Sequence, residues 1–186
     1  MKRAMKGRRA LVVSSGAMMV LCVLAGTCFT GAQTRDQAVV PVTCRVVAAL
    51  EATFPGAVTL GNLNVGAPPV TSAPQSVTVR SNAPWALNIK SDAQDGRLRQ
   101  WTGTAYLTPN PKMLSSPLEW KRQDGAEFVA ISGNEATVVS NMPPTGSAGT
   151  TVSIVFRQSA SYDDEALPDP GHTYRIEVTY TATQTY

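Results

Sequence analysis

Four carboxylates lie close together in the stretch SYDDEALPDPGHTY, which holds the side chains of this sequence best suited to metal chemistry. Oxygen ligands of the kind that calcium prefers come from Asp163, Asp164, Glu165 and Asp169. Their spacing matches no calcium loop such as the EF-hand, and a solvated loop between two strands accounts for it more simply. We therefore expect no bound metal and no other cofactor.

His172 is the only histidine of the chain, so a Ser-His-Asp triad would have to use it. Its surroundings, DPGHTY, are more simply a turn that leads into the last strand, and nothing nearby resembles a nucleophile elbow. The sequence therefore predicts no catalytic residue, and we expect the protein not to be an enzyme.

Tryptophan is the remaining residue type that could bind a ligand. Trp85 and Trp120 are in phase with aliphatic neighbours, which predicts that both belong to a core. Trp101 follows Arg97 and Arg99 in GRLRQWTGTAY, so these three residues are the candidate contact for a partner surface or a sugar. A structural role for Trp101 is the alternative.

The elements that position these residues have a period of two. Apolar residues alternate with polar ones in TVSIVFR and in TYRIEVTYTA, where Tyr174 and Tyr180 lie on the apolar face, as is typical of half-buried strands. In SVTVRSNAPWALNIK the alternation is interrupted at residues 81–84 and resumes with Trp85 and Leu87. This interruption predicts a bulge or a bend that switches sheets.

Asp124 and Gly125 predict a β-hairpin with a type I′ turn, because both positions tolerate a positive φ. Counting outward from the turn gives the pairs Arg122 with Glu127, Trp120 with Val129, and Leu118 with Ile131. Phe128 is expected on the other face, opposite Lys121. Apolar pairs then meet toward the core and opposite charges meet near the tip.

No long segment has helical periodicity, and most of the 13 prolines fall in connections such as GAPPVTSAP and LPDPG. Seven to nine strands separated by turns predict an all-β fold, a single Ig-like antiparallel β-sandwich. We assign this domain to residues 44–186.

Residues 1–32 have the layout of a secretory signal peptide. A basic front end precedes the apolar run from Ala10 to Ala25, and Thr30-Gly31-Ala32 offers the small residues that a signal peptidase requires. An uncleaved anchor is the alternative, and it would be the only contact with a membrane. Removal of these residues leaves 11 basic and 13 acidic residues, a net charge of −2, which does not favour binding to nucleic acid.

Residues 33–43 form an extended leader before the domain. The β-branched TRDQAVVPVTCRVV either pairs within its own domain as a first strand or adds to the open edge of another copy. Cys44, the only cysteine after the signal, is interpreted as a buried small hydrophobe, with intermolecular pairing as the alternative.

Two resemblances follow from these residues. The segment WAL at 85–87 and the terminal YRIEVTYTATQTY resemble the paired motifs of WxL-type bacterial cell-wall-binding proteins, with Tyr180 where that family usually has tryptophan. The stretches VTCRVVAALEATFPGAVTLGNLNVG and PGHTYRIEVTYTATQTY resemble secreted pilin and spore-coat-like β-sandwich subunits, with Ser81 where those subunits usually have a second cysteine. Both resemblances imply an envelope protein without catalysis.

The expected function is therefore that of an exported, non-enzymatic cell-envelope or surface protein that binds a cell-wall component or other envelope proteins. A pilin-like or coat-like subunit that self-associates by strand addition, and hence a homo-oligomer, is the first alternative. A carbohydrate-binding module is the second.

The exported protein should begin at or near Gln33, because small residues follow a short apolar run there. N-terminal sequencing of the exported form tests this cleavage. Recovery of intact Met1 in the membrane fraction would establish the anchor instead.

Overall fold

Alternating apolar and polar side chains give an all-β fold in the part of the chain that the computed structural model describes, residues 38–185. The strands there are β1 (Leu50–Thr53), β2 (Val70–Thr71), β3 (Gln75–Ser81), β4 (Trp85–Ser91), β5 (Arg97–Trp101), β6 (Met113–Pro117), β7 (Glu119–Arg122), β8 (Val129–Ala130), β9 (Ala136–Met142), β10 (Thr150–Gln158), β11 (Thr173–Arg175) and β12 (Val178–Gln184). The predicted signal peptide lies outside the described residues. Between residues 38 and 185 no helix long and apolar enough to cross a membrane occurs.

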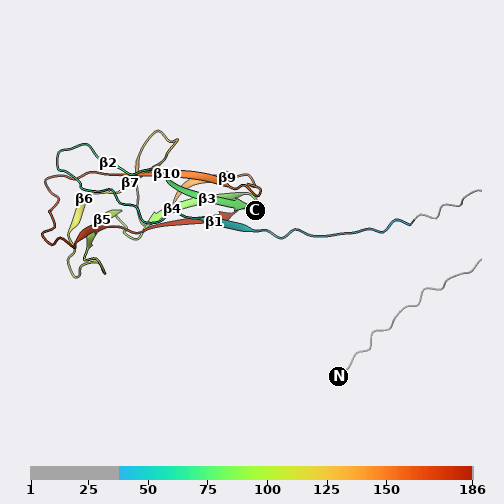
Figure 1. Cartoon of the computed structure of the whole chain (residues 1–186), viewed down its shortest axis with the longest axis horizontal. Coiled ribbons are helices and arrows are strands. Elements are labelled where there is room, and N and C mark those ends of the chain that lie inside the picture. Colours follow the sequence, from blue (N-terminus) through green and yellow to red (C-terminus); the bar gives the residue numbers. More distant parts are fainter. Residues whose placement is uncertain (1–37, 186) are drawn as a thin grey trace, which may run out of the picture. The chain divides into compact units, whose positions relative to one another are not determined.

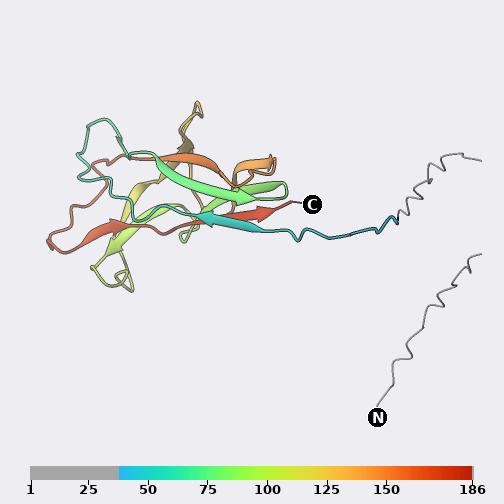
Figure 2. The same cartoon turned by 45° about the vertical axis from the view of Figure 1, so that its right-hand side comes forward.

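The strands form an antiparallel β-sandwich, as the alternation predicts. One sheet has the order β1-β3-β10-β7-β8, with β2 also paired to β10. The other strands form two smaller sheets, β12-β4-β9 and β11-β5-β6. β3 and β10 run side by side in one layer, and β1 lies near β12 (Figure 1, Figure 2). The described part has twelve strands, whereas seven to nine were expected. Strands of only two residues, such as β2 and β8, are too short to show an alternating pattern in the sequence.

The core lies between the buried faces of these sheets. Val77 and Val79 on β3 face it from the large sheet, and Trp85, Leu87 and Ile89 on β4 face it from a small one. The predicted change of sheet at residues 81–84 is therefore confirmed. Pro84 immediately precedes β4, where a missing backbone N–H costs no ladder bond.

A bend at Asp92 divides the second layer into its two small sheets. The N–H of Asp92 donates to the carbonyl of Glu177 at 2.9 Å, and Asp92 Oδ1 accepts the N–H of Glu177 at 3.0 Å. The predicted strand from Tyr174 to Tyr180 is therefore broken. Its first part, β11, pairs with β5, and its second part, β12, pairs with β4.

Gly96 allows the chain to turn sharply between β4 and β5. Its φ is +68°, and a Cβ atom added there would lie 1.9 Å from the carbonyl oxygen of Ile131. A side chain at this position would therefore collide with backbone, so the turn requires glycine.

The hairpin from Leu118 to Ile131 has the predicted register. Trp120 pairs with Val129, the N–H of Ile131 donates to the carbonyl of Leu118, and the Lys121 ammonium lies 5.0 Å from the centre of the Phe128 ring. The predicted turn is wrong, because Gly125 has no positive φ and its N–H donates to the carbonyl of Arg122. Arg122 forms its ion pair with Asp124 and not with Glu127.

The division of the chain by contacts falls between Thr43 and Cys44. The described residues 38–49 form no strand, so the leader residues 38–43 do not provide a first strand for the domain. The interpretation of Cys44 as buried is wrong. Its side chain is exposed because residues 44–49 precede β1 and no sheet covers them.

Substitution of Trp85 tests whether this residue belongs to the core. Its side chain is 0% exposed, and its indole N–H donates to the carbonyl of Pro143 at 3.0 Å. Trp85→Ala should lower the free energy of unfolding by about 3 to 5 kcal/mol, because it leaves a cavity and an unpaired carbonyl. Urea denaturation measures the loss. The control Tyr162→Ala, at a 93% exposed side chain, should stay within about 0.5 kcal/mol of the parent. An unchanged Trp85→Ala midpoint would contradict a core role.

Candidate functional site

The predicted contact residues Arg97, Arg99 and Trp101 lie on β5. They alternate with the buried residues Leu98 and Gln100, so all three belong to the outer side of the strand. The structure brings Arg99 and Trp101 together around Tyr106, whereas Arg97 lies apart from them, and each of the three has partners within the chain.

Trp101 is the centre of an aromatic stack. The Tyr106 ring lies edge-on to it at 5.1 Å between centroids, and the guanidinium of Arg175 lies 4.2 Å from the centre of the indole ring. Arg175 comes from β11, where Thr173 pairs with Trp101. One face of the indole ring is therefore occupied by a cation, and stacking on a sugar could use only the other face.

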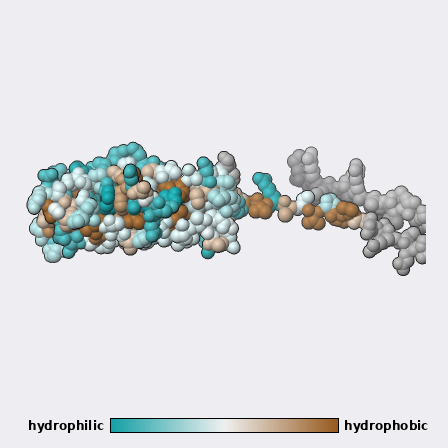
Figure 3. Space-filling model, turned by 90° about the horizontal axis from the view of Figure 1, so that it is seen from above, coloured by the Kyte–Doolittle hydropathy of each residue, from teal (hydrophilic) through white to brown (hydrophobic). Residues whose placement is uncertain are grey.

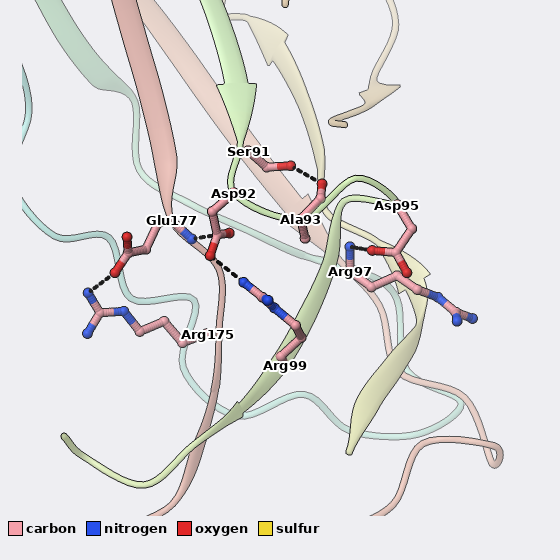
Figure 4. A network of polar contacts seen from close by, with 8 residues as sticks. All are labelled: Ser91, Asp92, Ala93, Asp95, Arg97, Arg99, Arg175 and Glu177. Atoms are coloured by element: carbon pink, nitrogen blue, oxygen red, sulfur yellow. Dashed lines mark hydrogen bonds and ion pairs between the residues drawn. The ribbon is translucent and has the colours of Figure 1, made fainter. Parts of the chain in front are cut away.

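Arg99 connects this stack to the bend of the second layer. Its guanidinium pairs with Asp92 and lies 4.1 Å from the centre of the Tyr106 ring (Figure 4 shows the ion pair). Asp92 also holds the backbone of Glu177, whose carboxylate pairs with Arg175 at 3.0 Å. The positive charges of Arg99 and Arg175 are therefore neutralised within the chain.

Tyr106 brings a buried phenol into this cluster. Its hydroxyl interacts with Asp92 and Arg99. Burial raises the pKa of the Tyr106 phenol, and the negative charge of Asp92 raises it further. The phenol therefore stays neutral at physiological pH.

Arg97 has a different role from its two neighbours on β5. Its Nε donates to the carbonyl of Ser115 at 3.1 Å, and the N–H of Arg97 donates to Asp95. Figure 4 shows that the side chain of Arg97 points away from the side chains of Arg99 and Arg175. It therefore ties β5 to β6.

Tyr106 was not among the residues predicted for this site. Trp101 and Tyr106 form an isolated bridge across the turn TGTA, in which Gly103 has a φ of +94°. Two aromatic residues flanking a short glycine-containing turn are a hairpin signal that was available in the sequence.

The residues of the WxL-like motifs and the predicted core residue Trp120 have structural positions. Trp85 and Leu87 are fully buried, and Trp120 is buried with its indole N–H unpaired. Tyr174 and Tyr180 are half-buried against the core. Burial raises the pKa of Tyr180 to about 12, and its ring stacks on Phe54 at 6.1 Å.

The carboxylates of the loop before β11 do not converge on one point, because Asp164, Glu165 and Asp169 each bind a different partner. Glu165 pairs with Lys112 at 2.9 Å, and Asp169 Oδ2 lies 3.3 Å from His172 Nδ1. His172 Nδ1 also lies 3.0 Å from Gln100 Nε2, which links the loop to β5. Within residues 38–185 no group of three or more histidine, cysteine or carboxylate side chains is arranged to hold a metal.

Asp164 fixes that loop to β6. Its carboxylate accepts the N–H of Ser161 at 2.7 Å and the N–H of Ser115. Burial alone would raise the pKa of Asp164, but these hydrogen bonds outweigh it and hold the pKa below its ordinary value.

The segment before β1 is the most exposed apolar part of the described chain. We call residues 39–47 the valine segment, because five of them are valines whose exposed fractions lie between 76% and 96%: Val39, Val40, Val42, Val46 and Val47. Figure 3 shows hydrophobic residues along this segment, whereas hydrophilic and intermediate residues cover much of the visible face of the folded body. The segment combines high β-propensity with an unpaired backbone.

Asn82 fixes the point at which this segment joins the domain. Its amide Nδ2 donates to the carbonyl of Val47 at 2.8 Å, and its Oδ1 accepts the N–H of Ala49 at 2.8 Å. The N–H of Asn82 also donates to the carbonyl of Ala49. The side chain thus acts as a short substitute for a neighbouring strand at the start of β1.

Comparisons of this chain with protein-family models, with curated proteins and with solved structures gave no match.

Asp164→Asn should destabilise the protein at neutral pH, because the amide cannot accept both backbone N–H groups without bringing its own N–H against one of them. A carboxylate with a lowered pKa contributes stability above its unfolded pKa of about 3.9, and this contribution is lost as the pH falls through the folded pKa. The melting temperatures of parent and variant should therefore differ most near pH 7 and converge below about pH 4.

Asp163→Asn is the matched control, since it removes the neighbouring, exposed carboxylate. Its melting temperature should follow that of the parent at every pH. An Asp164→Asn variant as stable as the parent at pH 7 would contradict the structural role of this carboxylate.

Proposed function

We propose that this chain is an exported, non-enzymatic protein of the cell envelope that binds other envelope proteins by adding its valine segment to their sheets as a strand. The observation that carries this proposal is the exposure of five valines on a stretch of chain that forms no strand of its own. The side chains of Asp164, Glu165 and His172 were considered for metal binding or catalysis. Each contacts another residue of its own chain and holds a loop or a strand in place, which is compatible with a non-enzymatic function.

Strand addition suits the chemistry of the valine segment. An extended peptide gains affinity from main-chain hydrogen bonds to a sheet edge and specificity from alternate side chains. Valine strongly favours the extended conformation, and Pro41 already fixes its own φ. Exposed apolar side chains in water also gain free energy when a partner covers them.

Direct binding to wall polymers has less support. Trp85 and Leu87 of the WxL-like motif are fully buried, so contact with peptidoglycan would need other residues. A carbohydrate-binding function would need an open aromatic face, and Arg175 covers one face of Trp101. The exposed backbone of the valine segment offers hydrogen bonding that a protein sheet complements better than a sugar does.

Envelope retention tests this proposal. In the producing cells, a variant with Val39, Val40 and Val42 changed to serine should be exported and folded but should pass from the envelope fraction to the soluble fraction. Serine keeps the length of the segment and the region of the signal cleavage, and it removes the apolar side chains. Immunoblots of the two fractions measure the change, and the melting temperature of the purified variant should equal that of the parent.

Val58→Ser together with Val65→Ser is the matched control, because it removes exposed valines from a loop of the domain itself. This control should remain in the envelope fraction. Retention of the leader variant at the parental level would refute the proposed function.

A further inference from the structure

One ring nitrogen of His172 has two competing partners. Nδ1 lies 3.0 Å from Nε2 of Gln100, a buried residue of β5, and 3.3 Å from Oδ2 of Asp169 in its own loop. The two contacts make opposite demands on the ring, because an amide NH2 group donates a proton and a carboxylate accepts one. The protonation state of His172 therefore decides which partner it binds.

The backbone of Lys112 fixes which end of the Gln100 amide faces the ring. The N–H of Lys112 donates to Gln100 Oε1 at 3.4 Å, and a backbone N–H can only donate. The amide oxygen must therefore lie toward Lys112 and the NH2 group toward His172. Since that NH2 group also can only donate, Nδ1 must accept, and the ring bound to Gln100 is the neutral imidazole with its proton on Nε2.

Protonation of His172 removes the contact with Gln100. Both nitrogens of a charged imidazole are donors, so the Nδ1 proton would meet the NH2 group of the amide. Turning the amide over does not help, because its NH2 group would then meet the N–H of Lys112. The carboxylate of Asp169 accepts the Nδ1 proton instead and also balances the charge of the ring.

Residues 166–172, which we call the strap, are attached to the domain through this ring. The chain before the strap is held by the ion pair of Glu165, and the chain after it enters β11. Within residues 38–185, the only hydrogen bond or ion pair from the strap to another part of the chain is the contact of His172 with Gln100. Loss of this one contact therefore frees the strap from β5.

The contact with Asp169 stays inside the strap. The N–H of His172 donates to the carbonyl of Asp169 at 3.0 Å and closes a turn between the two residues. An ion pair between their side chains strengthens this turn and adds nothing that holds the strap to β5. Protonation thus exchanges a contact between segments for a contact within one segment.

The other charged side chains of the elements packed against the strap are paired within the chain: Lys112 with Glu165, Arg99 with Asp92, and Arg175 with Glu177. The carboxylate of Asp164 accepts two backbone N–H groups, and that of Asp163 is exposed. On β11, burial and then the charges of Asp164 and Glu165 raise the pKa of Tyr174, so its phenol stays neutral. The carboxylate that contacts the ring is that of Asp169.

We infer that the strap is a pH-sensitive device, held on β5 by neutral His172 through Gln100 and released when protonation transfers the ring to Asp169. Histidine is the side chain that ordinarily changes its charge between about pH 5 and pH 8. The strap also lies beside the turn that joins Trp101 to Tyr106, because a Cβ atom added to Gly103 would lie 3.8 Å from the carbonyl oxygen of Gly171. This inference does not depend on strand addition by the valine segment.

NMR spectroscopy of the isotope-labelled, untagged exported chain tests this inference, because His172 is the only histidine and its ring signals are unambiguous. At about pH 7.5 the ring should carry its proton on Nε2, and nuclear Overhauser cross-peaks should connect the ring to the side-chain amide of Gln100. At about pH 5 these cross-peaks should be lost. The amide signals of Gln100 should shift with the same midpoint as the ring.

Two variants should move the midpoint of the ring titration in opposite directions. Asp169→Asn removes the acceptor of the charged ring and should lower the midpoint by about 0.5 pH units or more. Gln100→Met removes the donor to the neutral ring and should raise it. The control Asp163→Asn, at an exposed carboxylate of the same loop, should leave the midpoint unchanged.

The melting temperature of each variant checks that the domain is folded, and Asp169, whose side chain is 64% exposed, can be substituted without disturbing the core. A proton on Nδ1 at about pH 7.5 would overturn the inference. Cross-peaks between the ring and Gln100 that persist at about pH 5 would overturn it as well, and so would an Asp169→Asn midpoint equal to that of the parent. None of these measurements depends on envelope retention, so failure here and failure of the proposed function are separate results.

Discussion

Unpaired backbone at the sheet edges is the constraint on which the rest of this structure depends. Every edge strand presents N–H and C=O groups that must bind water, side chains or another strand. Asn82 satisfies this need at the start of β1 with its amide, and the stack of Phe54 on Tyr180 closes the side where β1 and β12 meet. Among the described strands, β9 is an edge strand that pairs only with β4.

The bend at Asp92 explains how the cluster around Trp101 is held together. The chain passes from one small sheet to the other at two places, and Asp92 links them by accepting the Glu177 N–H and pairing with Arg99. Arg99 and Arg175 are then drawn over the rings of Tyr106 and Trp101. The aromatic and basic residues that were predicted as a contact for a partner or a sugar therefore also hold the two strands at the bend.

Local patterns in the sequence predicted what depends on near neighbours. Alternation identified the buried residues of β3, β4 and β10, and counting from Asp124 gave the register of Trp120 with Val129. The turn type was wrong because the hydrogen bond from Gly125 to Arg122 and the contact of Gln123 with Ser153 select another backbone path. The predicted pairing of the two strands is correct despite the wrong turn type, because the apolar pattern of the flanking strands fixes the register.

Contacts between distant residues could not be predicted in this way. The break of the last strand depends on Asp92, which lies 85 positions before Glu177 in the chain. Cys44 has the composition of a buried strand around it, but burial also requires a neighbouring strand, and none covers residues 44–49. An apolar pattern therefore indicates only that a segment favours a covered position, and the fold decides whether its own chain provides the cover.

The valine segment has the apolar pattern of a covered strand, but no strand of the described chain covers it. Ordering a flexible peptide on a sheet costs about 1–2 kcal/mol per residue in backbone entropy, which would cancel much of the gain from burying its side chains. β-Branched residues and Pro41 reduce this cost, because the free segment already samples few conformations outside the extended region. A segment that is apolar, stiff and anchored at Asn82 is thus preorganised for pairing. The proposed strand addition therefore uses a segment whose composition lowers the cost of pairing with the sheet of another protein.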